Sequence, residues 1–266
     1  MKIAIIGTGN LGKSIAKGLI INNAITSLYL TKRNLDSINE LDGYKNVFIT
    51  KNNLEAVEKS DILIFAVQPA HFESILKEIK PNLTEKHVVI STVTGYVISK
   101  IEQQIGDDKF IIRAMPNTAI AVGKSMTCLC SNIQGEKRIK IAEAIFKRLG
   151  HAISIPESQM QAATVVCASG IAFWMRLIRA TTQAAIQLGF DAKEAQELAM
   201  YTSEGAASLL IENGNHPEEE IDRVTTPKGC TIEGLNEMEH KGLSSSLIQG
   251  MVASFQKINN IKKEQI

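Results

Sequence analysis

The sequence predicts an α/β fold with a parallel sheet over residues 1–156, followed by an all-helical domain over residues 157–266. Two observations support this prediction. As far as Ile155, short apolar runs of strand length alternate with segments of helical periodicity, which is typical of a parallel sheet covered by helices on both faces. Beyond Pro156, the apolar residues recur at helical spacing only.

The expected strands of the first domain are short and apolar. The run from Ile62 to Val67 is nearly continuous, which indicates a strand that is buried on both faces of the sheet. The other expected strands cover residues 3–6, 27–30, 47–50, 88–91, 110–113, 125–130 and 152–155. Apolar residues at helical spacing predict helices over residues 11–21 and 72–79.

The second domain is expected to contain a long helix, a second helix, a short acidic helix and two final helices. The long helix covers residues 158–188, and Gly189 after it suits a C-terminal cap. Asp191 begins the next helix, which ends at Asn213-Gly214. Residues 225–230 form the loop before the last two helices. A domain this small leaves alanine-rich apolar faces uncovered, so we expect a homodimer formed through these helices.

The composition, the cysteines and the N-terminus predict a cytoplasmic protein. Of the 266 residues, 44% are hydrophobic and 21% are charged, and the net charge of +1 favours neither nucleic acid nor an anionic membrane surface as a partner. Lys2 is followed by too few apolar residues for a signal peptide, and no run approaches the roughly 18 apolar residues that a membrane span needs. The cysteines are expected to be reduced, and their spacing matches no zinc site, so no metal site is predicted. They are Cys128, Cys130, Cys167 and Cys230.

A glycine-rich turn, GTGNLG at residues 7–12, lies between the first expected strand and the first expected helix. In this context the G-x-G-x-x-G spacing predicts dinucleotide binding, and therefore a Rossmann domain; a turn without a ligand is the alternative. Gly7 would form the tight turn, Gly9 would let the backbone approach a pyrophosphate, and Gly12 would let the helix pack closely on the strand. The helix N-terminus would add N–H groups and partial positive charge for the phosphates.

The end of the second strand indicates NADP as the cofactor. Proteins that prefer NAD usually place Asp or Glu about 20 residues beyond the glycines, where it holds the ribose 2′-hydroxyl. Here the segment Thr31-Lys32-Arg33-Asn34 contains two cations and no acid, which suits a 2′-phosphate. The alternative is that Lys32 and Arg33 are solvated surface charges.

A third motif, RAMPNT at residues 113–118, follows a strand whose carboxyl end should meet the same crevice. Pro116 would fix the backbone there, and Asn117 would offer an amide to the nicotinamide end of the cofactor. Taken alone this signal is weak, because Pro-Asn is common in turns.

Taken in order, the motifs resemble those of the pyrroline-5-carboxylate reductase family. They are GTGNLG at 7–12, AVQP at 66–69, RAMPNT at 113–118, CASGIAF at 167–173 and DRVTTPKGCTIEGL at 222–235. The resemblance spans nearly the whole chain, and RAMPNT and TTPKGCT are much more specific than the glycines. It implies a Rossmann domain followed by a helical dimerisation domain, and homodimers that form a higher assembly. It also implies hydride transfer from NADPH, or less often NADH, to 1-pyrroline-5-carboxylate, which yields L-proline.

The resemblance assigns site residues position by position. The cofactor-binding residues would be Gly7, Thr8, Gly9, Asn10, Leu11, Gly12, Thr31, Lys32, Arg33, Ala66, Val67, Gln68, Pro69, Met115, Pro116 and Asn117. The substrate-binding residues would be Ser169, Thr226, Lys228, Gly229, Cys230 and Thr231. Thr231 matches the family threonine near the substrate nitrogen and is the expected catalytic residue. Because it opens a helix, neighbouring amides would also favour the substrate carboxylate.

Several positions depart from the family pattern. Ile171 and Phe173 replace the proline and the tyrosine of SGSGPAY, and loss of the proline is expected to remove a helix kink. Lys228 replaces a glycine of TSPGG, which is costly if that position needs a positive φ. Gln68 replaces the lysine of AVKP.

These departures leave other functions open. One is a divergent NADP-dependent imine reductase acting on a related small carboxylate. Another is a paralogue that binds NADP without turnover, although Thr226 and Thr231 are both retained. A 6-phosphogluconate-type or hydroxyacid dehydrogenase would share the two-domain plan, but it would normally need a catalytic lysine on the long helix, and none occurs between Ser158 and Leu188.

Overall fold

The computed structural model describes residues 1–23 and 25–264, with side chains as far as residue 260. The chain forms two compact units. The sheet unit comprises Met1–Ser169 together with the end of the last helix from Lys257, and the helical unit comprises Gly170–Gln256.

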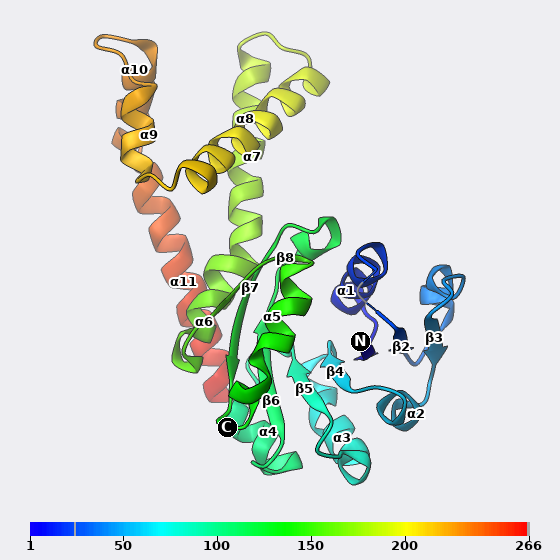
Figure 1. Cartoon of the computed structure of the whole chain (residues 1–266). Coiled ribbons are helices and arrows are strands. Elements are labelled where there is room, and N and C mark those ends of the chain that lie inside the picture. Colours follow the sequence, from blue (N-terminus) through cyan, green and yellow to red (C-terminus); the bar gives the residue numbers. More distant parts are fainter. Residues whose placement is uncertain (24, 265–266) are drawn as a thin grey trace. The chain divides into compact units, whose positions relative to one another are not determined.

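The sheet unit is built on one eight-stranded sheet with the strand order β3-β2-β1-β4-β5-β6-β7-β8 (Figure 1). The strands are β1 (Lys2–Ile6), β2 (Ser27–Thr31), β3 (Val47–Thr50), β4 (Ile62–Phe65), β5 (Val88–Ser91), β6 (Phe110–Met115), β7 (Ser125–Ser131) and β8 (Gly150–Ser154). β1 to β6 pair in parallel. The predicted strands are confirmed with small shifts at their ends, and β3 and β5 have the predicted bounds.

β7 corrects the expectation of a wholly parallel sheet. It runs antiparallel to β6, with Met115 opposite Cys128, and β8 is parallel to β7. The connection from β6 to β7 is shorter than the roughly a dozen residues that a parallel crossover needs. It holds a short 3₁₀ helix, η3 (Thr118–Val122), which ends at Gly123 with a φ of 70° and so returns the chain to the neighbouring position.

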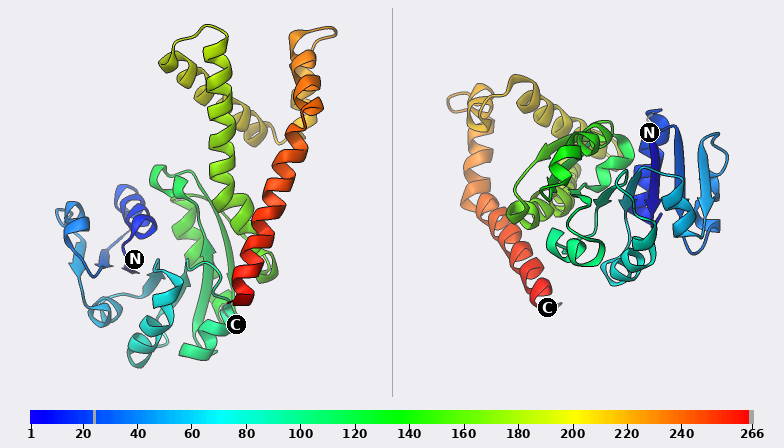
Figure 2. Two further views of the ribbon diagram at one scale, coloured as in Figure 1. Left: turned by 180° about the vertical axis from the view of Figure 1, so that it is seen from behind. Right: turned by 60° about the horizontal axis from the view of Figure 1, so that its bottom comes forward.

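Helices cover both faces of the sheet (Figures 1 and 2). One face packs against α1 (Asn10–Ile21), the 3₁₀ helix η1 (Asp36–Leu41) and α5 (Ile139–Lys147). The other face packs against α2 (Asn53–Glu58), α3 (Pro69–Ile79), α4 (Ile98–Ile105) and α6 (Met160–Ala163). The remaining 3₁₀ turns are η2 (Lys80–Asn82), η4 (Gly135–Arg138) and η5 (Glu157–Gln159). The predicted helices over 11–21 and 72–79 correspond to α1 and α3, whereas the shorter α2, α4 and α5 were not expected.

The helical unit contains α7 (Gly170–Gln187), α8 (Ala192–Asn213), α9 (Pro217–Arg223), α10 (Cys230–His240) and most of α11 (Leu243–Glu264). α7 and α8 pack against each other. The predicted caps at the two ends of α8 are confirmed. The Asp191 side chain accepts hydrogen bonds from the N–H groups of Lys193 and Glu194, and Gly214 ends α8 with a φ of 67°.

A π-helical turn, η6 (Thr164–Ser169), joins α6 to α7 and interrupts the predicted long helix. We expected the absence of proline at Ile171 to leave a regular helix, but the irregularity lies just before that position. Side chains also donate to backbone carbonyls in and next to this turn. Thr164 Oγ1 donates to Met160 O at 2.9 Å, and Asn117 Nδ2 donates to Cys167 O at 3.1 Å.

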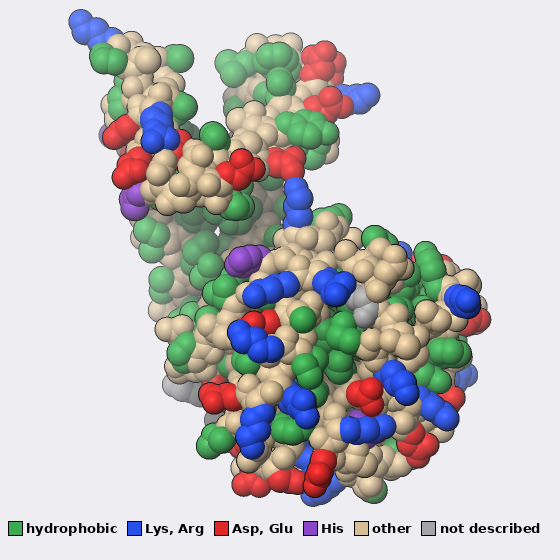
Figure 3. Space-filling model, viewed as in Figure 1, with side chains coloured by type: hydrophobic (Ala, Val, Ile, Leu, Met, Phe, Trp, Pro, Cys, Tyr) green, Lys and Arg blue, Asp and Glu red, His purple; other side chains and the backbone are tan. Residues whose placement is uncertain are grey.

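The segment Glu157–Gln187 is long and apolar enough to cross a membrane by length and composition alone, with a mean hydropathy of 1.4 over 18 residues. The expectation from the sequence concerned a continuous run of roughly 18 apolar residues, and no such run occurs here, because Gln, Ser, Thr and Arg residues interrupt the segment. Only 11% of that window is buried within the chain. Figure 3 shows hydrophobic side chains at the surface of the helical unit. The exposed hydrophobic residues include Trp174, Tyr201, Ile211 and Ile248.

Candidate functional site

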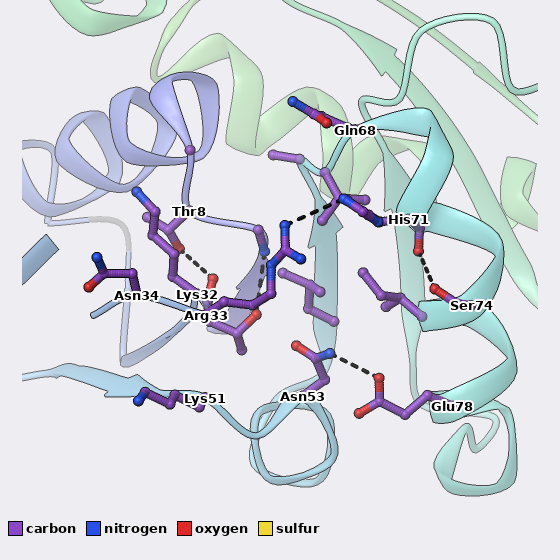
Figure 4. Close-up of a pocket in the computed structure, with 17 residues that line it drawn as sticks. Thr8, Lys32, Arg33, Asn34, Lys51, Asn53, Gln68, His71, Ser74 and Glu78 are labelled. Atoms are coloured by element: carbon purple, nitrogen blue, oxygen red, sulfur yellow. Dashed lines mark hydrogen bonds between the residues drawn. The ribbon is translucent and has the colours of Figure 1, made fainter. Parts of the chain in front are cut away.

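A cleft of about 600 Å³ opens at the carboxyl ends of β1, β2 and β4 (Figure 4). It lies beside β1, where the strand order reverses, which is the place where open α/β sheets bind ligands. Its lining includes the predicted cofactor residues Gly7, Thr8, Gly9, Thr31, Lys32, Arg33, Ala66, Val67 and Gln68. The remaining lining residues are Ile6, Asn34, Lys51, Asn53, His71, Ser74, Ile75 and Glu78.

The three glycines of the turn have different surroundings. Gly7 has a φ of 91°, and an added Cβ would lie 3.0 Å from Ala66 O and closer still to Val67 Cγ1. A Cβ on Gly12 would lie 2.5 Å from Gly7 O and 3.2 Å from Ile5 Cγ2, because α1 packs directly on the turn and on β1. Around Gly9, no atom of the described residues lies within 4 Å of the Cβ position. Gly7 and Gly12 therefore serve the fold, whereas Gly9 leaves room for a ligand.

Thr31 fixes the shape of the glycine turn. Its carbonyl oxygen accepts hydrogen bonds from Gly7 N at 3.2 Å and Thr8 N at 2.9 Å. Its hydroxyl accepts a further bond from Gly7 N at 3.3 Å. Thr31 itself is only 3% exposed. The two residues that follow it, Lys32 and Arg33, line the cleft and carry the positive charge at this end.

The guanidinium of Arg33 points across the cleft toward α3 (Figure 4). Arg33 Nη2 lies 3.4 Å from His71 Nε2, which orients it. Lys51 adds a third cation to the lining from the loop after β3. The carboxylate in the lining, Glu78, accepts a hydrogen bond from Asn53 Nδ2 at 3.1 Å. The arrangement places net positive charge beside the turn, which suits an anionic group.

Sequence analysis missed the side of the cleft formed by β3, α2 and α3. Lys51 and Asn53 follow the carboxyl end of a predicted strand, so the strand pattern contained a signal for both. His71, Ser74 and Glu78 enter the lining from α3, and no local motif marks them. Their position depends on how α3 packs on the sheet.

Several predicted cofactor residues lie outside the cleft lining. Asn10, Leu11 and Gly12 form the first turn of α1, directly after Gly9, and Pro69 begins α3 directly after Gln68. The other three predicted residues lie at the end of β6, which β5 separates from β4. Met115 is the last residue of β6, and Pro116 and Asn117 follow it.

The side chain of Asn117 makes internal hydrogen bonds. Its Oδ1 accepts from Ala119 N at 3.0 Å, and its Nδ2 donates to Cys167 O at 3.1 Å. Its backbone N–H donates to Ser125 Oγ at 3.1 Å. Asn117 therefore ties the end of β6 to η3 and η6.

Arg113, the first residue of RAMPNT, has a role that the motif did not indicate. It is 4% exposed, and its Nη1 donates to Glu157 Oε1 at 2.8 Å. The same oxygen accepts from Ile98 N at 2.7 Å, at the start of α4. The Arg113–Glu157 pair thus joins β6, η5 and α4, and it supports the loop between β5 and α4.

The predicted substrate residues lie on two segments. Ser169 ends η6 in the sheet unit, and the others lie in the helical unit on the loop into α10. Lys228 has a φ of 57°, so this position does require the left-handed backbone that glycine adopts without strain. Gly229 N donates to Thr226 O at 2.9 Å, which closes the loop. Cys230 and Thr231 form the first turn of α10, where N–H groups lack partners within the helix.

The residues of the cleft fit a dinucleotide. Gly9 leaves open space, and the first-turn N–H groups of α1 have no partner within the helix. Lys32, Arg33 and Lys51 supply further positive charge from neighbouring strands. These features together suit the phosphates of NAD or NADP.

Comparisons with known proteins agree with this geometry. Residues 2–95 match the family model described as NADP oxidoreductase, coenzyme F420-dependent. Residues 157–261 match the model described as pyrroline-5-carboxylate reductase dimerisation. The first model covers the N-terminal part of the predicted Rossmann domain, and the second covers nearly all of the predicted helical domain.

Two relatives come from Dictyostelium discoideum. The chain is 45% identical to pyrroline-5-carboxylate reductase 1 over 96% of its own length, and it spans 49% of that longer protein. It is 42% identical to pyrroline-5-carboxylate reductase 2 over 96% of its own length and 91% of that protein.

Solved structures have the same fold. A pyrroline-5-carboxylate reductase from Coxiella burnetii is 29% identical with a TM-score of 0.91, over 97% of each chain. The Plasmodium falciparum pyrroline carboxylate reductase with NADP bound is 24% identical with a TM-score of 0.87, over 98% of each chain. The chain therefore belongs to the pyrroline-5-carboxylate reductase family of oxidoreductases, with a Rossmann domain followed by a helical dimerisation domain.

Proposed function

We propose that this chain reduces 1-pyrroline-5-carboxylate to L-proline with NADPH, the final step of proline biosynthesis. The observation that carries the proposal is the cleft, in which the open position at Gly9 and the cations Lys32 and Arg33 lie on adjoining strand ends. Family membership supports this substrate, because relatives named pyrroline-5-carboxylate reductase match almost the whole chain.

NADP is the proposed cofactor in preference to NAD. The position that would hold an acidic partner of the ribose 2′-hydroxyl is occupied by Lys32 and Arg33, and Lys51 lines the same cleft. Arg33 can bond a phosphate through two N–H groups, and both lysines add charge. When bound, NADPH would supply the hydride for the imine carbon.

The proposed substrate contacts come from Ser169 and from the loop that contains Thr226, Lys228, Gly229, Cys230 and Thr231. N–H groups at the start of α10 would hold the substrate carboxylate. The Thr231 hydroxyl would hydrogen-bond the ring nitrogen and pass a proton to it. A protonated imine is already electrophilic, so the main task of these residues is orientation. Met115, Pro116 and Asn117 would lie at the nicotinamide end of the cofactor and fix the backbone there.

A homodimer in the cytoplasm is part of the proposal. The match to a dimerisation model over residues 157–261 and the exposed apolar side chains of the helical unit support the dimer. Whether the dimers assemble further is a question for a mass measurement. The four cysteines are free, which suits a reducing compartment.

The test is the loss of NADPH absorbance with 1-pyrroline-5-carboxylate, with NADH assayed alongside. Rapid turnover with NADPH supports the proposal. Arg33→Ala and Lys32→Ala should each raise KM for NADPH roughly tenfold and leave KM for NADH nearly unchanged. Lys140→Ala, which removes a cation on α5 that pairs with Glu143, is the matched control and should change neither.

Thr231→Ala tests the substrate loop in the same assay. It should lower kcat strongly while the Kd for NADPH stays constant. Equal losses of kcat and of NADPH affinity would show that the loop has a structural role. Tight NADPH binding without turnover on a panel of cyclic imines would favour a non-catalytic paralogue, and turnover only with another imine would favour a divergent reductase.

A further inference from the structure

Two thiols that the proposed reaction does not use lie in contact inside the sheet unit. Cys128 Sγ on β7 is 3.9 Å from Cys167 Sγ on η6. Cys128 is 3% exposed, whereas Cys167 is partly exposed. The two residues are far apart in the sequence, so the contact is created by the packing of η6 on the sheet.

The pair lies next to the carboxyl end of β6. Cys128 is the register partner of Met115 across the β6–β7 ladder. The backbone carbonyl of Cys167 accepts the hydrogen bond from Asn117 Nδ2 at 3.1 Å. Cys167 also belongs to a π-helical turn, a local irregularity that often marks functional positions.

The two thiols are chemically unequal. The hydrogen bond from the Cys128 thiol lowers the pKa of Cys167 to about 7, despite partial burial. The same hydrogen bond, together with burial, raises the pKa of Cys128 above its ordinary value. Because Cys167 is also the more exposed of the two, it is the nucleophile of the pair, and Cys128 is the neighbouring thiol that can attack the oxidised Cys167 sulfur.

We propose that Cys128 and Cys167 form an oxidation site that reacts with a peroxide and closes as a disulfide. The Cys167 thiolate attacks one oxygen of hydrogen peroxide, so an S–O bond forms, the O–O bond breaks and hydroxide leaves. Cys128 gives up its proton, and its sulfur displaces hydroxide from the Cys167 sulfenic acid to form the S–S bond. Two thiols are oxidised and one peroxide is reduced to two molecules of water.

Disulfide formation requires the sulfur atoms to approach from 3.9 Å to about 2.05 Å. β7 is held between β6 and β8, so η6 must supply most of the movement. This movement would disturb the hydrogen bond between Asn117 and Cys167. A loss of turnover on oxidation would follow from the proposed function, whereas the disulfide itself does not depend on that function.

The experiment exposes the reduced full-length chain to hydrogen peroxide, blocks remaining thiols with N-ethylmaleimide and maps the peptides by mass spectrometry. We expect a Cys128–Cys167 linked peptide that dithiothreitol removes. Cys130→Ser is the matched control, because Cys130 lies on the same strand and is similarly buried, whereas the short sulfur contact joins Cys128 to Cys167. This variant, and Cys230→Ser at the exposed cysteine, should still form the linked peptide.

Cys128→Ser and Cys167→Ser should each abolish the linked peptide. Mapping in the wild-type chain keeps the test valid even if the buried Cys128→Ser variant folds poorly. Oxidation confined to Cys230, or Cys167 sulfinate without a cross-link, would overturn the proposal. If the linked peptide forms in a chain that shows no reductase activity, the oxidation site stands and the proposed function fails.

Discussion

Gly7, Gly9 and Gly12 differ in what surrounds their α-carbons, although one motif contains all three. A side chain on Gly7 or Gly12 meets protein atoms, and Gly7 also has a positive φ. A side chain on Gly9 meets no described atom. The motif thus combines two positions that the fold needs with one that a ligand needs.

This difference predicts opposite outcomes for two alanine variants. Gly9→Ala should leave the thermal unfolding midpoint unchanged and weaken NADPH binding at least tenfold, because its methyl group occupies the space for the pyrophosphate. Gly12→Ala should lower stability by about 1–3 kcal/mol through overpacking of α1 on β1. Calorimetry of unfolding and of NADPH binding separates the two effects, and a destabilised Gly9→Ala variant would contradict the assignment.

Lys228 carries backbone strain in the loop before α10. Its φ of 57° is left-handed, which costs a non-glycine residue about 1–2 kcal/mol. Lys228→Gly should therefore raise the unfolding midpoint of the full chain, by a net of about 0.5–1 kcal/mol after the greater unfolded-state freedom of glycine. Lys228→Asn should give part of this gain, and Lys228→Ala, which removes the charge but keeps the strain, should give none. A gain with alanine as large as with glycine would instead point to charge repulsion.

At the scale of elements, His87 joins two connections of the sheet unit. Its Nδ1 accepts from Thr84 N at 2.9 Å, and its Nε2 lies 3.2 Å from Val57 O at the end of α2. This pair of bonds fits a neutral ring with the proton on Nε2. Burial, opposed in part by the bond to Val57, lowers the pKa of His87 from its ordinary value of 6.5.

The lowered pKa predicts acid sensitivity of the sheet unit. In the unfolded chain His87 takes up a proton near pH 6.5, whereas in the folded chain it does so only at a lower pH. Below pH 6.5 the unfolded state therefore binds more protons than the folded state. The contribution of His87 to stability is therefore complete above pH 6.5 and is lost progressively below it. Urea unfolding against pH should show this slope in the wild type and in His151→Asn, where the histidine is exposed. His87→Asn should be less stable at neutral pH and lack that slope; an unchanged slope would exclude His87 as its source.

At the scale of the whole molecule, the helical unit exposes more apolar side chain than an isolated chain favours. Trp174, the single tryptophan, is 61% exposed within one chain. In a dimer formed through α7, it would be covered.

Trp174 therefore reports on assembly. Light scattering should give a mass of at least two chains, and the native protein should show tryptophan emission at short wavelength. Trp174→Glu should lower the mass without unfolding the sheet unit, which circular dichroism and NADPH binding can check. A one-chain mass for the wild type, with emission typical of exposed tryptophan, would exclude the dimer.

The sequence by itself determined the strand–helix alternation of the first domain, the helical second domain and the glycine turn, because periodicity and turn chemistry are local properties. Its motifs also indicated the family and the cations at Lys32 and Arg33, which follow directly from a strand end. Lys51 could have been found in the same way. The short helices α2, α4 and α5 have too few turns for a clear periodicity.

Only the tertiary structure decided the features that depend on distant segments. The antiparallel direction of β7 follows from a connection too short for a crossover, and the π-helical turn η6 is tied to the end of β6 by the hydrogen bond from Asn117 to Cys167 O. The α3 side of the cleft and the contact of Cys128 with Cys167 require elements far apart in the chain to pack on one sheet. Residue order fixes local conformation through short-range sterics and hydrogen bonds, whereas these contacts arise only when burial of the apolar faces brings the elements together.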